Sequence, residues 1–457
     1  MLNEIIRQVT YIKDRITFKQ WFFIVAILSI SVDGFPLFPV SSNNRPLSII
    51  FIFIYYFIDK VEKKYFYKYE VHIYIFYLIL WVFTYLKAFY AYHDYRGLIK
   101  FTVTGVFGVV SVCSCLSFYQ EITDKYKITT LINILVYSLI LSSILPLLVG
   151  FLQYLSLINI LPYSFVNFIT LLFSYRPLED RIQLLNTEPA QAGTFLIFVF
   201  FNVMAFYNDN ERFKVFLLII IFIFIVILSS SLTYMTFLFA LLLYIILFKK
   251  INIYKFIKFI MVLFVLSLLL FFVSSYFLTD YTLNKLIFIK DLIVNFDEDY
   301  IDKVFLVDFS SFDRLTTPIT GFASLEYSYF MGAGGESFFY LYEDIILDRY
   351  AFMLKNTDLQ EILINNMQSP KFLYSKIVAD FGIILFTAVS FFTYKMFSIL
   401  KKYYSSDTLI KSLSLCVTNA VVSTHMASYF NFQIILIICL FVYYVFFNGR
   451  SKFIDKI

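Results

Sequence analysis

The chain has 457 residues, of which 60% are hydrophobic and only 15% are charged. Soluble domains are about 45–50% apolar and about 25% charged, so this composition excludes an ordinary soluble protein and predicts an all-α polytopic integral membrane protein. The net charge of +5 does not indicate nucleic-acid binding, because the basic residues lie at the ends of apolar runs. Those runs are continuous, whereas the strands of a membrane β-barrel alternate.

The predicted elements begin with an amphipathic helix over residues 1–20, in which apolar and basic side chains alternate as in a helix lying at the membrane interface. Twelve apolar segments follow, each of which we predict to be a membrane span. One helix needs roughly 20 residues to cross a bilayer core. Only a short Ser- and Thr-containing stretch separates the seventh segment from the eighth, so the number of spans there is open. The segments are residues 20–36, 46–58, 70–91, 98–119, 128–155, 187–207, 213–230, 232–248, 257–278, 372–397, 408–427 and 429–447.

One long hydrophilic stretch divides the chain into three predicted parts. Residues 1–278 form a membrane bundle of about nine helices, residues 279–371 a large and partly helical loop, and residues 372–457 about three further spans. Lys and Arg concentrate in alternate connecting segments once the long loop, which is largely exempt from the positive-inside rule, is set aside. We therefore expect both termini in the cytoplasm, and the long loop and the active face on the periplasmic side.

The first candidate site lies at the start of segment 187–207. Arg176 and Arg181 precede this segment, and Glu188 and Gln191 are three residues apart, on one face of the next helix. Ionisable residues at the membrane edge that face a bundle interior are costly and usually functional. Alternatively, the arginines extend toward lipid headgroups and Glu188 only complements a helix N-terminus. We prefer this alternative for Arg176 and a functional role for Arg181 and Glu188.

The second candidate site lies in the long loop. Arg314 precedes an expected helix, and the stretch MGAGGESF places Gly332, Gly334 and Gly335 in one turn. A glycine-rich turn permits close backbone approach and offers N–H groups to a phosphate. Such a turn is more often only a turn, so it is a weak signal by itself.

The third candidate site is the point where the chain re-enters the membrane. Lys371, Tyr374 and Lys376 lie at the entry and Asp380 lies further in. A basic cluster in this place suits pyrophosphate binding, and ordinary interfacial anchoring explains it equally well.

Three further features are candidates for chemistry. His425 lies at the expected outer end of a late helix, and His93 lies beside Arg96 at another outer end. A lone histidine is more often structural than catalytic. The carboxylates of 297–299 have a spacing that can chelate a divalent cation, but they lie in a generally acidic stretch and are better explained as a solvated turn. We expect neither a metal site nor a cofactor.

These pieces, in this order, resemble the O-antigen polymerase and ligase superfamily of bacterial envelope glycan assembly. The architectural likeness covers nearly the whole chain, while the motifs are short and degenerate. Many members, notably ligases, carry His-Asn before the last motif, where this chain has Pro370-Lys371-Phe372. This departure favours the polymerase (Wzy-like) branch. The residues that carry the resemblance are Arg181, Gly193, Asp308, Ser310, Arg314, Gly332, Gly334, Tyr374, Ala379, Asp380 and Gly382.

The resemblance implies a GT-C-like glycosyltransferase of the bacterial inner membrane. Its substrates would be oligosaccharide repeat units linked to undecaprenyl pyrophosphate, and its partners a chain-length regulator and a flippase of the same pathway. Positive charge would stabilise the diphosphate leaving group and replace a metal ion. Glu188 would accept the proton of the attacking hydroxyl, with His425 as the second choice. The expected catalytic residues are Glu188, Arg181, Arg314 and His425, and the expected pyrophosphate-binding residues are Arg176, Gln191, Lys371, Tyr374, Arg96 and Gly334.

Two other interpretations remain open at this point. One is the ligase branch of the same superfamily. The other is a lipid-linked oligosaccharide flippase or another transporter, which would show matched halves, broken helices and buried charges near the membrane midplane. The sequence shows no internal repeat, and transport does not explain the long one-sided loop.

Overall fold

The computed structural model describes residues 2–36, 46–178, 181–227, 231–249, 309–351, 368–426 and 431–448, together with Leu354, Gln360 and Leu363. The described residues are predominantly helical, and no β-strand occurs among them. Their helices are α1 (Leu2–Lys13), α2 (Phe18–Leu28), α3 (Ser48–Lys63), α4 (Lys68–Lys87), η1 (Ala88–Tyr92), α5 (Arg96–Lys125), α6 (Ile128–Leu157), α7 (Tyr163–Leu171), α8 (Pro189–Phe206), α9 (Glu211–Ile227), α10 (Ser231–Phe248), α14 (Phe309–Tyr327), α15 (Phe339–Arg349), α17 (Leu373–Tyr403), α18 (Thr408–Val422), η3 (Ser423–Met426), α19 (Phe432–Val442) and η4 (Tyr443–Asn448).

Five of these helical stretches are long and apolar enough to cross a membrane: Lys68–Tyr92, α5, α6, α8 and α17. Four shorter apolar stretches accompany them: Phe18–Leu28, Thr236–Phe248, Thr408–Val422 and Phe432–Phe447. The protein is therefore an all-α protein with apolar membrane-length helices. The total of twelve spans and their orientation stay predictions, and the expected span 257–278 lies outside the described residues.

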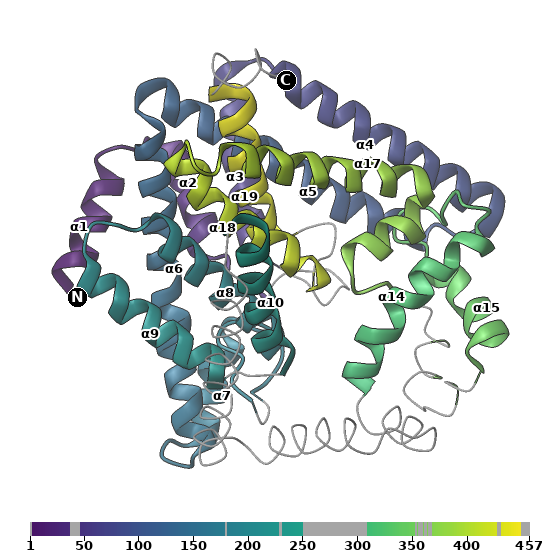
Figure 1. Cartoon of the computed structure of the whole chain (residues 1–457). Coiled ribbons are helices and arrows are strands. Elements are labelled where there is room, and N and C mark those ends of the chain that lie inside the picture. The colour runs from purple at the N-terminus through teal and green to yellow at the C-terminus, as the bar shows by residue number, and fades with distance from the viewer. Residues whose placement is uncertain are drawn as a thin grey trace.

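Helix α18 occupies the centre of the main bundle. It packs against α8, α10, α17 and α19, and α19 packs in turn against α5. The last contact includes a buried hydrogen bond, in which the Tyr119 hydroxyl donates to the Leu436 carbonyl over 2.8 Å. Because α18 and α19 come from the end of the chain, the C-terminal helices complete the core begun by the N-terminal ones (Figure 1).

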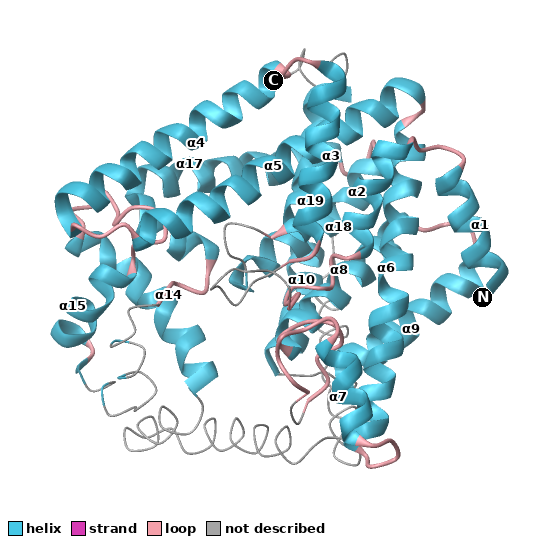
Figure 2. Cartoon of the chain, turned by 180° about the vertical axis from the view of Figure 1, so that it is seen from behind, coloured by secondary structure: helices cyan, strands magenta, loops and turns pink. Residues whose placement is uncertain are grey.

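Helix α4 lies at the edge of the bundle and packs against α5 (Figures 1 and 2). Much of its apolar surface is exposed, including Ile75, Leu78 and Ile79. A helix that is apolar on nearly all sides and exposed on most of them is expected to face lipid. The apolar exposure of α4 thus fits a membrane-embedded protein.

Helix starts follow local capping chemistry. The Asp407 carboxylate accepts hydrogen bonds from the backbone N–H groups of Leu409 and Ile410 at the start of α18. Pro189 stands at the first position of α8, where no backbone N–H donor is needed. Pro189 thus favours the start of α8 at this position, which is where the first candidate site lies.

Two predicted spans differ from the structure. The predicted span 20–36 is helical only as far as Leu28, and residues 29–36 continue without regular helix. The predicted span 372–397 breaks at Gly382, whose φ of +70° is not helical, so α17 consists of two helical pieces. In both places a hydropathy average hides a change of backbone direction.

The described part of the long loop is mainly helical. Helix α14 packs against both α15 and α17, and α15 begins directly after the glycine-rich turn (Figure 2). Arg314 lies inside α14 rather than before a helix, because α14 already begins at Phe309. The carboxylates of 297–299 lie outside the described residues.

Candidate functional site

The loop that joins α7 to α8 carries a pair of opposite charges. Arg176 Nη1 lies 3.3 Å from Glu188 Oε1, and each side chain is about one-third exposed. Glu188 is the N-cap residue of α8 and has an extended backbone, so it precedes the first helical turn in which it was predicted. The structure therefore joins the two residues across twelve positions and gives Arg176 a partner other than a lipid headgroup.

The other predicted residues of this loop lie nearby in the chain but have their own surroundings. Arg181 is half-buried. Gln191 lies in the first turn of α8, where its Oε1 accepts a hydrogen bond from the Thr187 hydroxyl over 3.0 Å. Glu188 and Gln191 therefore do not act on one shared helix face as predicted. Gln191 contacts the capping segment, and Glu188 contacts Arg176.

Asp33 belongs to this site and was missed in the sequence. Its Oδ1 accepts a hydrogen bond from the backbone N–H of Thr187 over 2.8 Å, and its Oδ2 accepts one from Asn186 Nδ2 over 3.1 Å. A backbone hydrogen bond from Tyr175 to the Gly34 carbonyl, of 2.9 Å, joins the same two segments. The non-helical stretch after α2 thus brings a second carboxylate to the segment that holds Glu188.

The pKa of the Asp33 carboxyl is raised to about 7. Burial among the surrounding protein atoms is the largest cause, and the negative charge of Glu188 adds to it. The hydrogen bonds from Asn186 and Thr187 stabilise the carboxylate and lower the pKa in part. The only sequence signal for Asp33 was an acidic residue in an apolar run, directly before Gly-Phe-Pro.

The loop is held in place by Gln153 of α6. The Gln153 Oε1 accepts hydrogen bonds from the backbone N–H groups of Gln183 (3.1 Å) and Leu184 (2.9 Å), and its Nε2 donates to the Leu184 carbonyl over 2.9 Å. Gln153 is fully buried. A buried amide that forms hydrogen bonds with the backbone of a loop fixes the loop's conformation. Gln153 thus holds in place the loop that carries the Arg176–Glu188 pair.

A second group of charges forms around the glycine-rich turn. The N–H groups of Ala333 and Gly334 donate to the carbonyls of Ala379 and Asp380, both over 2.7 Å. These carbonyls belong to the turn of α17 before its break, where the missing next turn leaves them without helical donors. The turn therefore caps a broken helix, which explains its glycines by packing, and phosphate binding by Gly334 stays a prediction.

Glu336, at the end of this turn, forms a buried ion pair. Its Oε2 lies 2.8 Å from Lys376 Nζ and 3.0 Å from Lys100 Nζ, and its backbone N–H donates to Asp380 Oδ2 over 2.9 Å. Burial raises the pKa of Glu336, but Lys376 and Lys100 outweigh it and lower the pKa to about 2. Glu336 is thus an ionised residue that joins α5, the glycine-rich turn and α17.

Three predicted binding residues lie around this second group. Arg96 is exposed, pairs with Asp94 over 2.7 Å and lies over the Phe339 ring at the start of α15. The hydroxyls of Tyr374 and Thr393 are 2.8 Å apart, so Tyr374 joins the two pieces of α17. Lys371 is exposed, and its backbone N–H donates to the Thr317 hydroxyl over 3.3 Å.

The structure thus brings some of the predicted residues into two groups of contacts, while the side chains of two others are not described. Arg176 and Glu188 belong to the first group. Arg96 belongs to the second, together with Lys376 and Asp380. The side chains of Arg314 and His425 lie outside the description, although their backbones are in α14 and η3.

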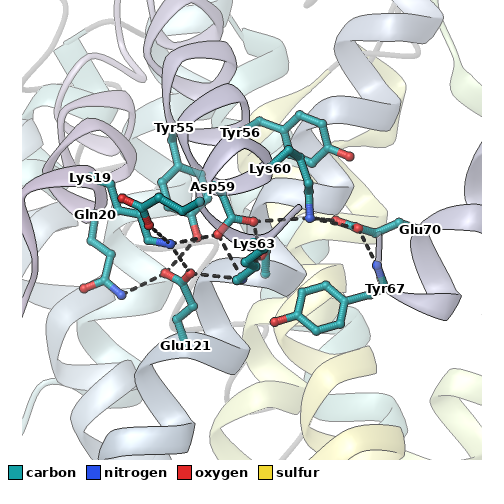
Figure 3. Close-up of polar contacts among 12 residues, drawn as sticks. Lys19, Gln20, Tyr55, Tyr56, Asp59, Lys60, Lys63, Tyr67, Glu70 and Glu121 are labelled. Atoms are coloured by element: carbon teal, nitrogen blue, oxygen red, sulfur yellow. Dashed lines mark hydrogen bonds and ion pairs between the residues drawn. The ribbon is translucent and has the colours of Figure 1, made fainter. Parts of the chain in front are cut away.

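The densest charge cluster was not predicted and lies at the ends of α2, α3, α4 and α5 (Figure 3). Asp59 is fully buried and lies within 3.2 Å of the amino groups of Lys19, Lys60 and Lys63. Glu121 contacts Lys19 and Lys63, while Glu70 contacts Lys60 over 2.7 Å. We call Lys19, Asp59, Lys60, Lys63, Glu70 and Glu121 the ionic network. Within this network each charge is paired with an opposite charge, which is typical of a cluster that holds helices together.

Within the described part of the chain, no three His, Cys, Asp or Glu side chains converge so as to hold a metal ion. No family model, curated protein or solved structure matches this chain.

Proposed function

We propose that the protein is a membrane glycosyltransferase that polymerises oligosaccharide repeat units carried on undecaprenyl pyrophosphate, at the periplasmic face of the bacterial inner membrane. The product would be an O-antigen or a similar surface polysaccharide. The observation that carries the proposal is the Arg176–Glu188 pair, held on a braced loop beside the start of α8 with Arg181 in the same loop. The sequence resemblance described above supports it independently.

The chemistry fits this group of residues. A hydroxyl oxygen of the acceptor sugar would attack the anomeric carbon of the donor sugar, and the bond from that carbon to the phosphate oxygen would break. The electron pair leaves with the diphosphate, whose growing charge is stabilised by nearby guanidinium groups. A partly exposed Arg176 can meet a diphosphate while Glu188 keeps the guanidinium oriented.

The second group has a supporting role in this proposal. The Glu336–Lys376 pair is buried, and Glu336 also contacts Lys100, so it fixes the position of α17 and the glycine-rich turn. Arg96 is the exposed cation beside it and is the member of this group that can reach a ligand at the membrane edge. Arg314, Lys371 and His425 keep their predicted roles as parts of the proposal.

The test is reconstitution of the purified protein in lipid vesicles with a synthetic undecaprenyl-pyrophosphate-linked repeat unit. We expect a ladder of longer lipid-linked glycans and the release of undecaprenyl pyrophosphate, with no loss of rate in excess EDTA. If transfer strictly required a divalent metal ion, the proposal that arginine side chains stabilise the diphosphate leaving group in place of a metal would be wrong. Transfer that occurs only onto lipid A–core would identify the ligase branch instead.

A second candidate function is transport of a lipid-linked oligosaccharide. The break of α17 at Gly382, with Lys376 and Asp380 buried beside it, is the kind of interrupted helix that forms binding sites in transporters. In the same vesicles, transport would appear as a change in the accessibility of the labelled glycan to an added lectin, with no change in glycan length. That result would replace the polymerase proposal.

A further inference from the structure

Asp33 lies between two parts of the proposed site. It comes from the non-helical stretch after α2, and both of its carboxylate oxygens accept hydrogen bonds from residues 186–187. The next residue, Glu188, contacts Arg176. As a whole residue, Asp33 is half-buried. A carboxylate fixed by two neutral donors, against the segment that leads to Glu188 and its partner Arg176, has a position suited to a proton acceptor.

Glu188 is less suited to that task. Its Oε1 already contacts the guanidinium of Arg176. If Glu188 took up the proton, this contact would weaken and the guanidinium that the leaving group needs would no longer be held. Asp33 has neutral N–H partners instead, so it can gain a proton without breaking an ion pair. The two carboxylates therefore have different roles. Glu188 positions Arg176, and Asp33 is available for proton transfer.

We propose that the Asp33 carboxylate accepts the proton of the attacking sugar hydroxyl, an inference that rests on the proposed glycosyl transfer. In the step, the hydroxyl O–H bond breaks as the oxygen bonds to the anomeric carbon. The proton goes to a carboxylate oxygen of Asp33, and the electron pair of the broken carbon–oxygen bond leaves on the diphosphate. Solvent then removes the proton from Asp33 before the next cycle.

The raised pKa of Asp33 supports this role without carrying it. A base works best when its pKa is near the operating pH, and the pKa of Asp33 is about 7. The active form is the ionised one, so the rate should rise as the pH rises through about 7 and level off above it. The described charged residues of the adjoining loop are Arg176, Arg181 and Glu188, and the negative charge of Glu188 contributes to the raised pKa of Asp33.

The experiment compares Asp33→Asn and Asp33→Glu with the wild type in vesicles that contain the undecaprenyl-pyrophosphate-linked repeat unit. We expect Asp33→Asn to lower the transfer rate by about 100-fold or more and to abolish its rise near neutral pH, because general-base catalysis contributes about 10²–10⁴-fold. Asp33→Glu should keep the rise and retain a rate within about tenfold of the wild type. Photo-crosslinking of the donor lipid should be unchanged in both variants.

The matched control is Asp209→Asn, the same chemical change at Asp209, which contacts Arg7 and Tyr137 away from the site. Its pH profile should equal that of the wild type. An Asp33→Asn protein with the wild-type rate and pH profile would overturn the inference while leaving glycosyl transfer intact. Loss of donor crosslinking and of thermal stability in both Asp33 variants would overturn it in favour of a purely structural role. A wild type without any transfer would overturn the proposed function, and the inference with it.

Discussion

Gly332 and Gly382 approach so closely that a Cβ atom on Gly332 would lie 2.5 Å from the backbone nitrogen of Gly382. Both residues have positive φ angles, +87° and +70°, which side-chain-bearing residues rarely adopt. A Cβ on Gly382 would lie 2.2 Å from the Phe330 carbonyl oxygen. The glycine-rich turn and the break in α17 are therefore one structural unit, in which each glycine must lack a side chain because backbone atoms of the other segment lie against it.

We expect Gly332→Ala to destabilise the protein by at least about 2 kcal/mol, since a strained backbone costs about 1–3 kcal/mol and the contact adds to it. The midpoint of thermal unfolding in detergent measures the loss. The control is Gly321→Ala in α14, which has no positive φ and whose Cβ would meet Pro370 Cγ at 3.0 Å. Its cost should be clearly smaller, and equal losses at the two positions would contradict the fitted turn.

The buried Glu336–Lys376 pair should stabilise the fold in a pH-dependent way. The pKa of Glu336 is lowered in the folded protein, from 4.5 to about 2. A lowered folded-state pKa gives stability that is fully present above the unfolded-state value and is lost as the pH falls toward 2. The temperature at the midpoint of unfolding of the wild type should therefore decrease as the pH is lowered from about 5 to 2.

Glu336→Gln should remove most of that pH dependence and, at neutral pH, destabilise by about 3–5 kcal/mol, because it removes the carboxylate that compensates the buried charge of Lys376. The double variant Glu336→Gln with Lys376→Met should recover part of the loss. A single variant as stable as the wild type, with an unchanged pH profile, would show that the pair does not hold the turn.

Asp59 of the ionic network should contribute far more to stability than Glu62, which is not a member of the network but pairs with its Lys19. Asp59 is fully buried and contacts three lysines, so Asp59→Asn should cost about 3–5 kcal/mol. Glu62 is 54% exposed and contacts only Lys19 among its described ion pairs, so Glu62→Gln should cost less than about 1 kcal/mol. Thermal unfolding of the two variants in one detergent makes the comparison. Similar losses would mean that burial does not set the strength of the network.

At the proposed site, Arg176→Ala should lower glycan transfer by about 10²-fold or more, because a donor aimed at developing charge contributes about that much. Arg176→Lys should recover only part of the rate, since an ammonium cannot bond a diphosphate in the bidentate way. The rate of ladder formation in vesicles is the measurement. Arg212→Ala, an exposed arginine at the start of α9, is the matched control and should leave the rate unchanged.

The sequence alone predicted the helical membrane class and most helix positions. Predicted segment 128–155 corresponds to α6 at Ile128–Leu157, and 187–207 corresponds to α8 at Pro189–Phe206. These predictions succeed because hydropathy is a local property, summed over neighbours in the chain. It fails at Leu28 and Gly382, where the apolar run continues but the helix does not.

The sites were harder to predict because they depend on contacts between distant segments. Sequence reasoning identified Glu188 and Arg176 but not their pairing, and it counted Asp33 as part of a span. It noticed Lys376 and the glycine-rich turn separately, and the structure joins them through Glu336. No spacing rule links residue 33 to residue 187 or residue 100 to residue 336, because such contacts follow from the packing of whole helices.

The ionic network bears on how the protein is assembled during synthesis. All of its members lie between Lys19 and Glu121, so the ribosome completes them long before the glycine-rich turn and α17 exist. Chains fold from the N-terminus as they emerge, and each unpaired member would be costly to leave at the membrane edge. The first four apolar helices can thus lock together early and present a finished surface against which α18 and α19 later dock. Defects in the network should then appear as early degradation of nascent chains rather than as slow inactivation of the mature protein.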